Sequence, residues 1–363
     1  MIPYFILIAL PLFVWLLSRH YRFTTDKRVL FETRSASIDV FMLIFLFLLA
    51  LRGLQCGVDT KQYLRIFNTY STQSVQQLFE RYEIEFGYKL LNRFVGFIGG
   101  DYQLLLIITS LICVCPLWYF YRRETENQLL TIALFLTVAP YMMYFSGIQQ
   151  SIAMSLGIFA WYAAKDRKLV RFIAMVLLAM QFHISAFVLF PLYPLYRAKI
   201  TKKWLWFVVP CMVAVFVFRS TIFNFLLTLL WREYSTTPAT DATTILYLLI
   251  LFGVYAYIIP DDNKMDEDTI AMRNILLLSI VIQIFALLHP VSMRMNYYFL
   301  LFVPILIPKI ASRSKTQFTQ ISRLSVVVMT VYFLYYFVKK VVTDGDSLNI
   351  FPYIPFWNNE WLP

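Results

Sequence analysis

Three residues have a side chain suited to proton transfer and stand in polar segments between or within apolar runs: Asp59, Glu85 and His183. A carboxylate or an imidazole placed there can accept the proton of an attacking hydroxyl group, and the ordinary pKa of histidine suits this role near neutral pH. Asp59 follows Gly57 and precedes an amphipathic stretch, so it also fits the simpler role of a helix N-cap. The sequence does not separate a catalytic base from a carboxylate that only binds substrate.

Arginine residues at the ends of the same apolar runs are candidates for binding an anion. Arg52 and Arg294 are the leading candidates, and Arg219 is the third. Guanidinium groups form paired hydrogen bonds with phosphate and stabilise charge that develops on a leaving group. Each arginine also fits an ordinary residue that reaches the lipid head groups, and for Arg219 the two interpretations have equal weight.

Aromatic and amide side chains lie close to these residues in the sequence and suit sugar binding through stacking and hydrogen bonds. The candidates for substrate binding are Tyr63, Tyr88, Asn92, Gln149, Gln150, His289 and Tyr297. The four cysteines show no metal-ligand spacing, and neither a metal nor a cofactor is expected. An acidic run at residues 261–268 is expected to form a solvated loop.

The elements that position these residues are predicted to be membrane spans. Hydrophobic residues make up 60% of the 363 residues and charged residues only 15%, against roughly a quarter charged in soluble domains. Mean hydropathy is +0.65. Residues 2–17 are interpreted as a retained first span rather than a cleavable signal peptide. Further apolar runs lie at residues 41–51, 104–119, 129–145, 172–189, 204–218, 245–259, 275–288 and 326–338. Several are shorter than the roughly 20 residues of a perpendicular helix, but their number predicts an all-α polytopic membrane protein.

The net charge of +11 is explained by membrane orientation rather than by nucleic-acid binding. Basic loops face the cytoplasm, and one alternating set of loops holds 21 of the 32 lysine and arginine residues. That set comprises residues 18–37, 121–128, 165–171, 197–203, 260–273 and 309–323. The assignment requires residues 170–196 to form two short helices that fold back at His183. It then predicts about twelve crossings and external N- and C-termini.

The same topology predicts how the single membrane domain, residues 1–363, is arranged. All the candidate site residues fall on the external face. Residues 52–101 form an external loop whose amphipathic helices lie in the membrane interface and carry part of the site, and residues 339–363 form an external C-terminal tail.

Short motifs carrying the candidate residues follow one another through most of the chain. They are Arg52…Gly57-Val-Asp59-Thr-Lys-Gln-Tyr63, Glu85-Phe-Gly-Tyr88…Asn92, Gly147-Ile-Gln-Gln150, Phe182-His183-Ile-Ser185, Arg294-Met-Asn-Tyr297 and Pro352-Tyr-Ile-Pro-Phe-Trp357. Through this ordered set the sequence resembles the EpsG family of bacterial exopolysaccharide proteins, which are similar to Wzy-type polysaccharide polymerases. It departs from the family at Gln149, where arginine is common, and at Thr60, where an aromatic residue is frequent. The first departure weakens a phosphate-binding role for that turn.

The resemblance implies a glycosyltransferase that joins oligosaccharide repeat units carried on undecaprenyl pyrophosphate. It implies the external face of the bacterial inner (plasma) membrane and a fold similar to the GT-C-like, membrane-embedded lipid-sugar glycosyltransferases. Arginine would stabilise the pyrophosphate leaving group, and a carboxylate or histidine would act as base. Expected partners are the lipid-linked glycan, membrane lipids, and a chain-length regulator and flippase of the same pathway.

Two other functions fit the sequence. A transporter or flippase of lipid-linked saccharides fits a dozen spans, but it needs polar groups near mid-bilayer, where these spans are almost free of charge. A membrane acyltransferase that modifies the glycan would use His183 as its base, but the sequence shows no distinctive motif for an acyl donor.

Overall fold

Short polar side chains set the starts of several apolar helices. The carboxylate of Asp101 accepts a hydrogen bond from the Leu104 amide at 2.9 Å, and the Asp266 carboxylate accepts one from Thr269 at 2.7 Å. The Asn127 side chain accepts one from Leu130 in the same way. Each bond satisfies a backbone N–H group that the first helical turn leaves without a partner.

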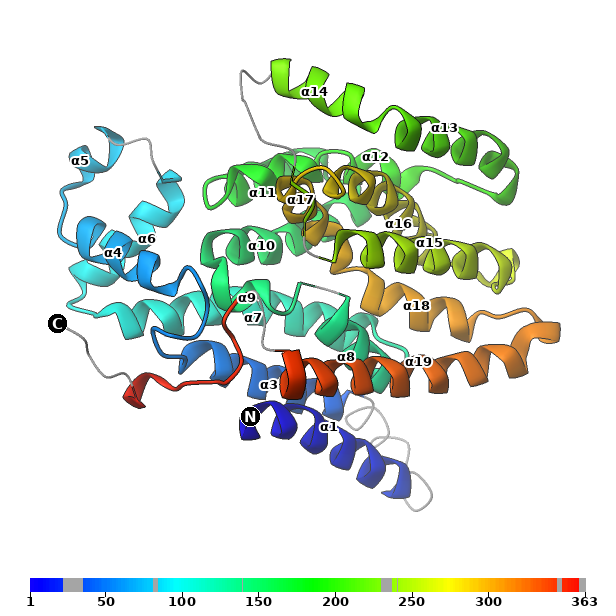
Figure 1. Ribbon diagram of the computed structural model, residues 1–363, viewed down its shortest axis with the longest axis horizontal. Coiled ribbons are helices and arrows are strands. Elements are labelled where there is room, and N and C mark those ends of the chain that lie inside the picture. The colour runs from blue at the N-terminus through cyan, green and yellow to red at the C-terminus, as the bar shows by residue number, and fades with distance from the viewer. Residues whose placement is uncertain are drawn as a thin grey trace.

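The computed structural model describes residues 1–21, 35–80, 84–138, 140–229, 237–239, 241–344 and 348–358. The basic loop expected at 18–37 and the tail expected at 339–363 lie partly outside these residues. In the part that is described, regular structure is helical, apart from isolated β-bridges that pair Arg52 with Pro355 and Pro260 with Ser314 (Figure 1).

The helices follow one another along the whole described chain. In order they are α1 (Ile2–Tyr21), α3 (Ala36–Ala50), α4 (Thr60–Tyr70), α5 (Val75–Glu80), α6 (Phe86–Phe97), α7 (Tyr102–Glu124), α8 (Gln128–Thr137), α9 (Met143–Ser146), α10 (Ile148–Lys165), α11 (Leu169–Met180), η1 (Ile184–Leu189), α12 (Leu192–Arg197), η2 (Lys202–Trp204), α13 (Leu205–Val217), α14 (Arg219–Leu229), α15 (Ala242–Ile258), η3 (Asp262–Lys264), α16 (Glu267–Ala286), α17 (Pro290–Leu300), α18 (Val303–Ser312), η4 (Thr316–Phe318), α19 (Thr319–Lys339), η5 (Lys340–Asp344) and η6 (Phe356–Asn358).

Among the described residues, three helices are long and apolar enough to cross a membrane: α7, α16 and α19 with its flanking turns. The count rises to five if each of two bent pairs forms one span. These pairs are α13 with α14, bent by 71°, and α17 with α18, bent by 47°. Five further apolar helices are shorter, at 10–17 residues. The protein is therefore an all-helical membrane protein with three to five candidate spans.

Large apolar side chains remain exposed on the outer helices, as expected where lipid rather than water surrounds the protein. Trp206 on α13 is 88% exposed, and no residue of α13 is buried. On α6 the polar residue Asn92 is fully buried, whereas Phe94 and Phe97 are exposed. This inverts the pattern of a water-soluble amphipathic helix, and it fits a helix whose apolar face rests against lipid.

The chain reverses direction at His183. Leu169 begins α11 close to Lys165, which pairs with Asp268, and the helix ends at Met180, shortly before Ile184 donates a backbone hydrogen bond to Glu85. The chain then returns through η1 and α12, and the Tyr196 hydroxyl donates a hydrogen bond to Asp268. Residues 170–196 therefore form the expected fold-back rather than one continuous helix.

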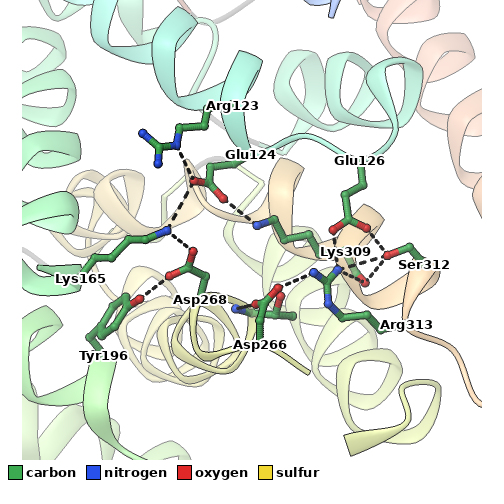
Figure 2. Close-up of polar contacts among 11 residues, drawn as sticks. Arg123, Glu124, Glu126, Lys165, Tyr196, Asp266, Asp268, Lys309, Ser312 and Arg313 are labelled. Atoms are coloured by element: carbon green, nitrogen blue, oxygen red, sulfur yellow. Dashed lines mark hydrogen bonds and ion pairs between the residues drawn. The ribbon is translucent and has the colours of Figure 1, made fainter. Parts of the chain in front are cut away.

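Ion pairs join several of the loops that were predicted to be cytoplasmic, and Figure 2 shows this cluster. Lys165 at the end of α10 pairs with Asp268 at the start of α16. Arg313, after α18, pairs with Glu126 at 2.6 Å and with Asp266 at 2.5 Å. We call this side of the molecule the ion-pair end. The expectation of a solvated acidic loop is wrong for Asp268, because its side chain is only 16% exposed and bonds to Lys165 and Tyr196.

The pair formed by Glu124 and Lys309 is the most buried part of this cluster. Their side chains are 7% and 6% exposed, and the Lys309 ammonium lies 2.7 Å from the carboxylate (Figure 2). Lys165 lies 3.9 Å from the other oxygen of Glu124. The pair joins the end of α7 to α18, and it neutralises two charges that would be costly if buried alone.

At the opposite end, residues 348–356, here called the C-terminal strap, bind to the segment between α3 and α4. Gly53 and Val58 donate backbone hydrogen bonds to Ile354 and Leu348, at 2.8 and 3.0 Å. Phe356 donates one to Leu51 at 2.9 Å. The strap thereby holds the segment that leads to Asp59.

Candidate active site

Residues far apart in the sequence line one polar cavity at the end of the molecule opposite the ion pairs. Its volume is about 290 Å³. Its lining includes the predicted catalytic residues Asp59 and His183 and the predicted anion-binding Arg294. The full lining is Asp59, Gln62, Tyr63, Ile66, Ile84, Met143, Gly147, Gln149, Gln150, His183 and Arg294. We call it the polar cavity.

Asp59 stands at the N-cap position of α4, but its side chain makes no capping hydrogen bond. Its carboxylate instead accepts a hydrogen bond from the Ser146 hydroxyl at 3.3 Å, and that hydroxyl accepts one from the Asp59 backbone amide at the same distance. The simpler N-cap role therefore does not account for this carboxylate. It lines the polar cavity and is available to a ligand.

Gly57 makes the turn that presents Asp59. Its φ is +100°, in the region that favours glycine. An added Cβ would lie 2.4 Å from the carbonyl oxygen of Phe145, so another residue would displace α9. The Gly-Val-Asp motif thus reflects close backbone approach between two segments that line the cavity.

Glu85 lies beside the polar cavity and joins two of its walls. One carboxylate oxygen accepts a hydrogen bond from the Gln149 side-chain amide at 2.8 Å, and the other accepts one from the Ile184 backbone amide at 3.0 Å. Gly87 donates a further backbone hydrogen bond to Gln181 at 2.8 Å. Glu85 does not line the polar cavity, and its two hydrogen bonds hold Gln149 and the backbone next to His183 in place.

The hydrogen bonds of His183 define which of its ring nitrogens carries the proton. Nδ1 accepts from the Ser185 backbone amide at 3.3 Å and lies 2.6 Å from the Ser185 hydroxyl. A backbone N–H group can only donate, so Nδ1 carries no proton and the neutral ring is protonated at Nε2. The Ser185 hydroxyl lies 3.0 Å from that of Tyr298, which then donates to it. His183 is thus held as a hydrogen-bond donor rather than a base.

We predict that His183 is neutral at pH 7 and carries its proton on Nε2. Burial lowers the pKa of His183 below its ordinary value of 6.5, while Glu85 raises it and Arg294 lowers it further. Because the folded state disfavours the charged ring, the contribution of His183 to the free energy of unfolding is fully present at pH values above 6.5. That contribution is lost as the pH falls through the folded-state pKa.

Nitrogen-15 NMR of histidine-labelled protein measures both properties, because the sequence has only three histidines and single substitutions of His20 and His289 assign the signals. A proton on Nδ1 of the neutral ring, or a titration midpoint above 6.5, would contradict the prediction.

Arg294 on α17 lines the polar cavity and forms no ion pair with any described residue. Its backbone carbonyl accepts a hydrogen bond from the Gln150 side chain at 2.6 Å, which links α17 to the first turn of α10. The N-terminus of α10 therefore lies at the same cavity, and a helix N-terminus favours negative charge. An unpaired guanidinium and a helix N-terminus together suit an anionic ligand.

The predicted sugar-binding residues divide between the cavity wall and the layer behind it. Tyr63 lines the cavity, and its hydroxyl accepts a hydrogen bond from the Gln149 backbone amide at 3.5 Å. Burial raises the pKa of Tyr63 well above its ordinary range. Tyr88 packs edge-on against Tyr63, with ring centroids 5.6 Å apart. Tyr88 and Asn92 are both fully buried and do not line the cavity.

The remaining predicted residues lie away from the lining of the polar cavity. Arg52 is 2% exposed, and its guanidinium donates to the Leu49 carbonyl at 2.5 Å. Arg219 donates to the carbonyl of Phe216 at 2.7 Å. The His289 ring accepts from the Val291 amide at 3.1 Å and so caps α17. Tyr297 lines a neighbouring cavity.

Two residues that the sequence did not single out bind the candidate catalytic groups directly. Ser146 bonds to Asp59, and Ser185 bonds to His183. The contact between Ser185 and His183 is local, because His183 is the N-cap of η1 and its ring accepts a hydrogen bond from the Ser185 amide two residues ahead. The contact of Ser146 with Asp59 spans 87 residues and has no local signal.

The polar turns that line this cavity are the ones that carry the ordered motifs. No curated protein and no solved structure matches the chain. The EpsG family pattern matches residues 39–354, which include every lining residue of the polar cavity. The chain therefore belongs to the EpsG family and is a membrane protein of polysaccharide biosynthesis.

Proposed function

We propose that this protein is a polysaccharide polymerase that joins repeat units carried on undecaprenyl pyrophosphate. The observation that carries the proposal is the meeting of Asp59, His183 and Arg294 at one cavity. These residues supply a proton acceptor, a hydrogen-bond donor and a fixed positive charge. Transfer of a glycan from a lipid pyrophosphate to a sugar hydroxyl needs all three.

In the proposed reaction, the oxygen of an acceptor sugar hydroxyl attacks the anomeric carbon of the donor glycan. The bond from that carbon to the pyrophosphate oxygen breaks, and its electron pair leaves with the pyrophosphate. Asp59 accepts the hydroxyl proton. Arg294 and the N-terminus of α10 stabilise the negative charge of the leaving group, and the Nε2–H of His183 donates a hydrogen bond to the reacting groups.

The proposal also places the polar cavity at the external membrane face, with about twelve crossings and a GT-C-like helical scaffold. It is supported by the separation of charge along the molecule. Basic loops and their ion pairs gather at one end, and the polar cavity lies at the other. Basic residues favour the cytoplasmic side, so the cavity would open where lipid-linked repeat units are extended.

The reaction is tested with purified protein in lipid nanodiscs and a lipid-linked repeat unit as the sole substrate. We expect longer glycans and stoichiometric release of undecaprenyl pyrophosphate, without any nucleotide sugar. Arg294→Ala should lower the rate by roughly 10²–10³-fold, the cost of removing one donor that stabilises developing negative charge in a serine protease. Movement of the substrate across the bilayer of proteoliposomes without elongation would support a flippase instead, and acylation of an unextended glycan would support an acyltransferase.

A further inference from the structure

A second cavity lies against the first and differs from it in character. Its volume is about 350 Å³, and apolar side chains form most of its wall, among them Leu136 of α8, Ile245 of α15 and Phe337 of α19. Arg294 and Met143 line both cavities, so the two spaces meet there. We call it the apolar cavity.

Lys340 adds a second positive charge to the apolar cavity. It is the first residue of η5, a π-helical turn that continues α19, and such turns are frequent at functional sites. Its ion pair with Asp241 has a separation of 3.8 Å, and the Asp241 side chain is 49% exposed. A long ion pair with a half-exposed carboxylate is weak, so Lys340 can exchange this partner for an anionic ligand.

The lining of the apolar cavity therefore fits a ligand with an anionic head and an apolar tail. Arg294 and Lys340 supply two cations and Asp241 supplies one carboxylate, at a wall that is otherwise largely apolar. A polyprenyl diphosphate has this chemistry, because two phosphates adjoin an isoprenoid chain. A free diphosphate would use the cations but not the apolar wall.

We infer that the apolar cavity receives the polyprenyl diphosphate leaving group, with Arg294 and Lys340 binding its phosphates, while the polar cavity receives the acceptor sugar. This inference rests on the proposed function and divides the reaction between the two cavities. Arg294 stands where they meet, next to the bond that breaks. The cavity volume suits the head group and the first isoprenoid units rather than the entire lipid.

The test measures binding of farnesyl diphosphate and inorganic pyrophosphate to the full-length protein in nanodiscs. We expect farnesyl diphosphate to bind more tightly than inorganic pyrophosphate. Lys340→Ala should weaken farnesyl diphosphate binding by about tenfold or more, as expected for a hydrogen bond between charged groups, and Lys340→Arg should restore most of it. Lys339→Ala is the matched control, because Lys339 is exposed and does not line the cavity, and its affinity should stay within about twofold.

Three results would overturn the inference: equal binding by Lys340→Ala and the wild type, equal binding of the two ligands, or an equal loss in Lys339→Ala. If any of these occurs while the wild type still elongates glycans, the cavity assignment fails and the proposed function stands. If the wild type neither elongates glycans nor binds a prenyl diphosphate, the proposed function fails as well.

Discussion

Replacing Asp59 with alanine is expected to lower the rate of glycan elongation by roughly 10²–10⁴-fold, the usual contribution of a general base. Its carboxylate lines the polar cavity and makes no capping bond, and its hydrogen-bond donors are confined to the Ser146 hydroxyl among the described residues. Stability should therefore change little. The measurements are the initial rate of polymer formation in nanodiscs and the thermal midpoint of the same preparation.

Asp101→Ala is the matched control for this prediction. Asp101 also stands at a helix N-cap, but its carboxylate accepts a hydrogen bond from Leu104 and lies outside the cavity lining. We expect it to cost about 0.5–2 kcal/mol of stability with a nearly unchanged rate per folded molecule. If Asp59→Ala loses stability and retains its rate, Asp59 is a capping residue and the base must be sought elsewhere.

Replacing Glu124 with leucine is expected to destabilise the protein by about 3–5 kcal/mol, the usual cost of leaving one member of a buried ion pair alone. Lys309 would then keep its charge at 6% exposure without a carboxylate partner. Lys165 would be less affected, because it retains Asp268. Reversible unfolding in mixed micelles measures the free energy of unfolding.

The double substitution Glu124→Leu with Lys309→Met removes both charges and should recover much of the lost stability. Asp166→Leu is the exposed comparison, since Asp166 pairs with Lys168 at 3.5 Å while both side chains are about half exposed. It should cost no more than about 1 kcal/mol. Equal losses for Glu124→Leu and Asp166→Leu would contradict the assigned burial.

The fold-back at His183 shows how much of the architecture could be predicted from the sequence. Basic loops on both sides of residues 170–196 require a reversal, and the contacts of Lys165 and Tyr196 with Asp268 agree with it. The acidic run is harder to interpret. The partners of Asp266 and Asp268 lie 47 and 103 residues away, and local charge patterns do not reveal such contacts.

Part of the candidate site could also be predicted, because polar residues are rare in an apolar chain and stand out in its sequence. Polar turns between apolar helices single out Asp59, His183 and Arg294, and these residues share a cavity. The sequence does not distinguish residues that face the cavity from residues that support it. Tyr88 and Asn92 share a helical stripe with Glu85, but helix packing buries both of them.

The role of Lys340 has no sequence signal. It adjoins Lys339 in the predicted external tail, although only Lys340 lines the apolar cavity. Successive residues of a helix point in different directions. Lys339 is therefore exposed, whereas the adjacent Lys340 points into the cavity. Such a difference depends on how α19 packs against its neighbours, which periodicity alone does not define.

The C-terminal strap also sets the order in which the site is completed during synthesis. The Tyr353 hydroxyl bonds to the carbonyl of Leu48, 305 residues earlier in the chain. At ordinary rates of translation, these partners emerge about 15–60 s apart. Until the strap arrives, the segment before Asp59 lacks the backbone bonds that hold it. Nascent chains that stop short of the strap would therefore insert into the membrane without an assembled site.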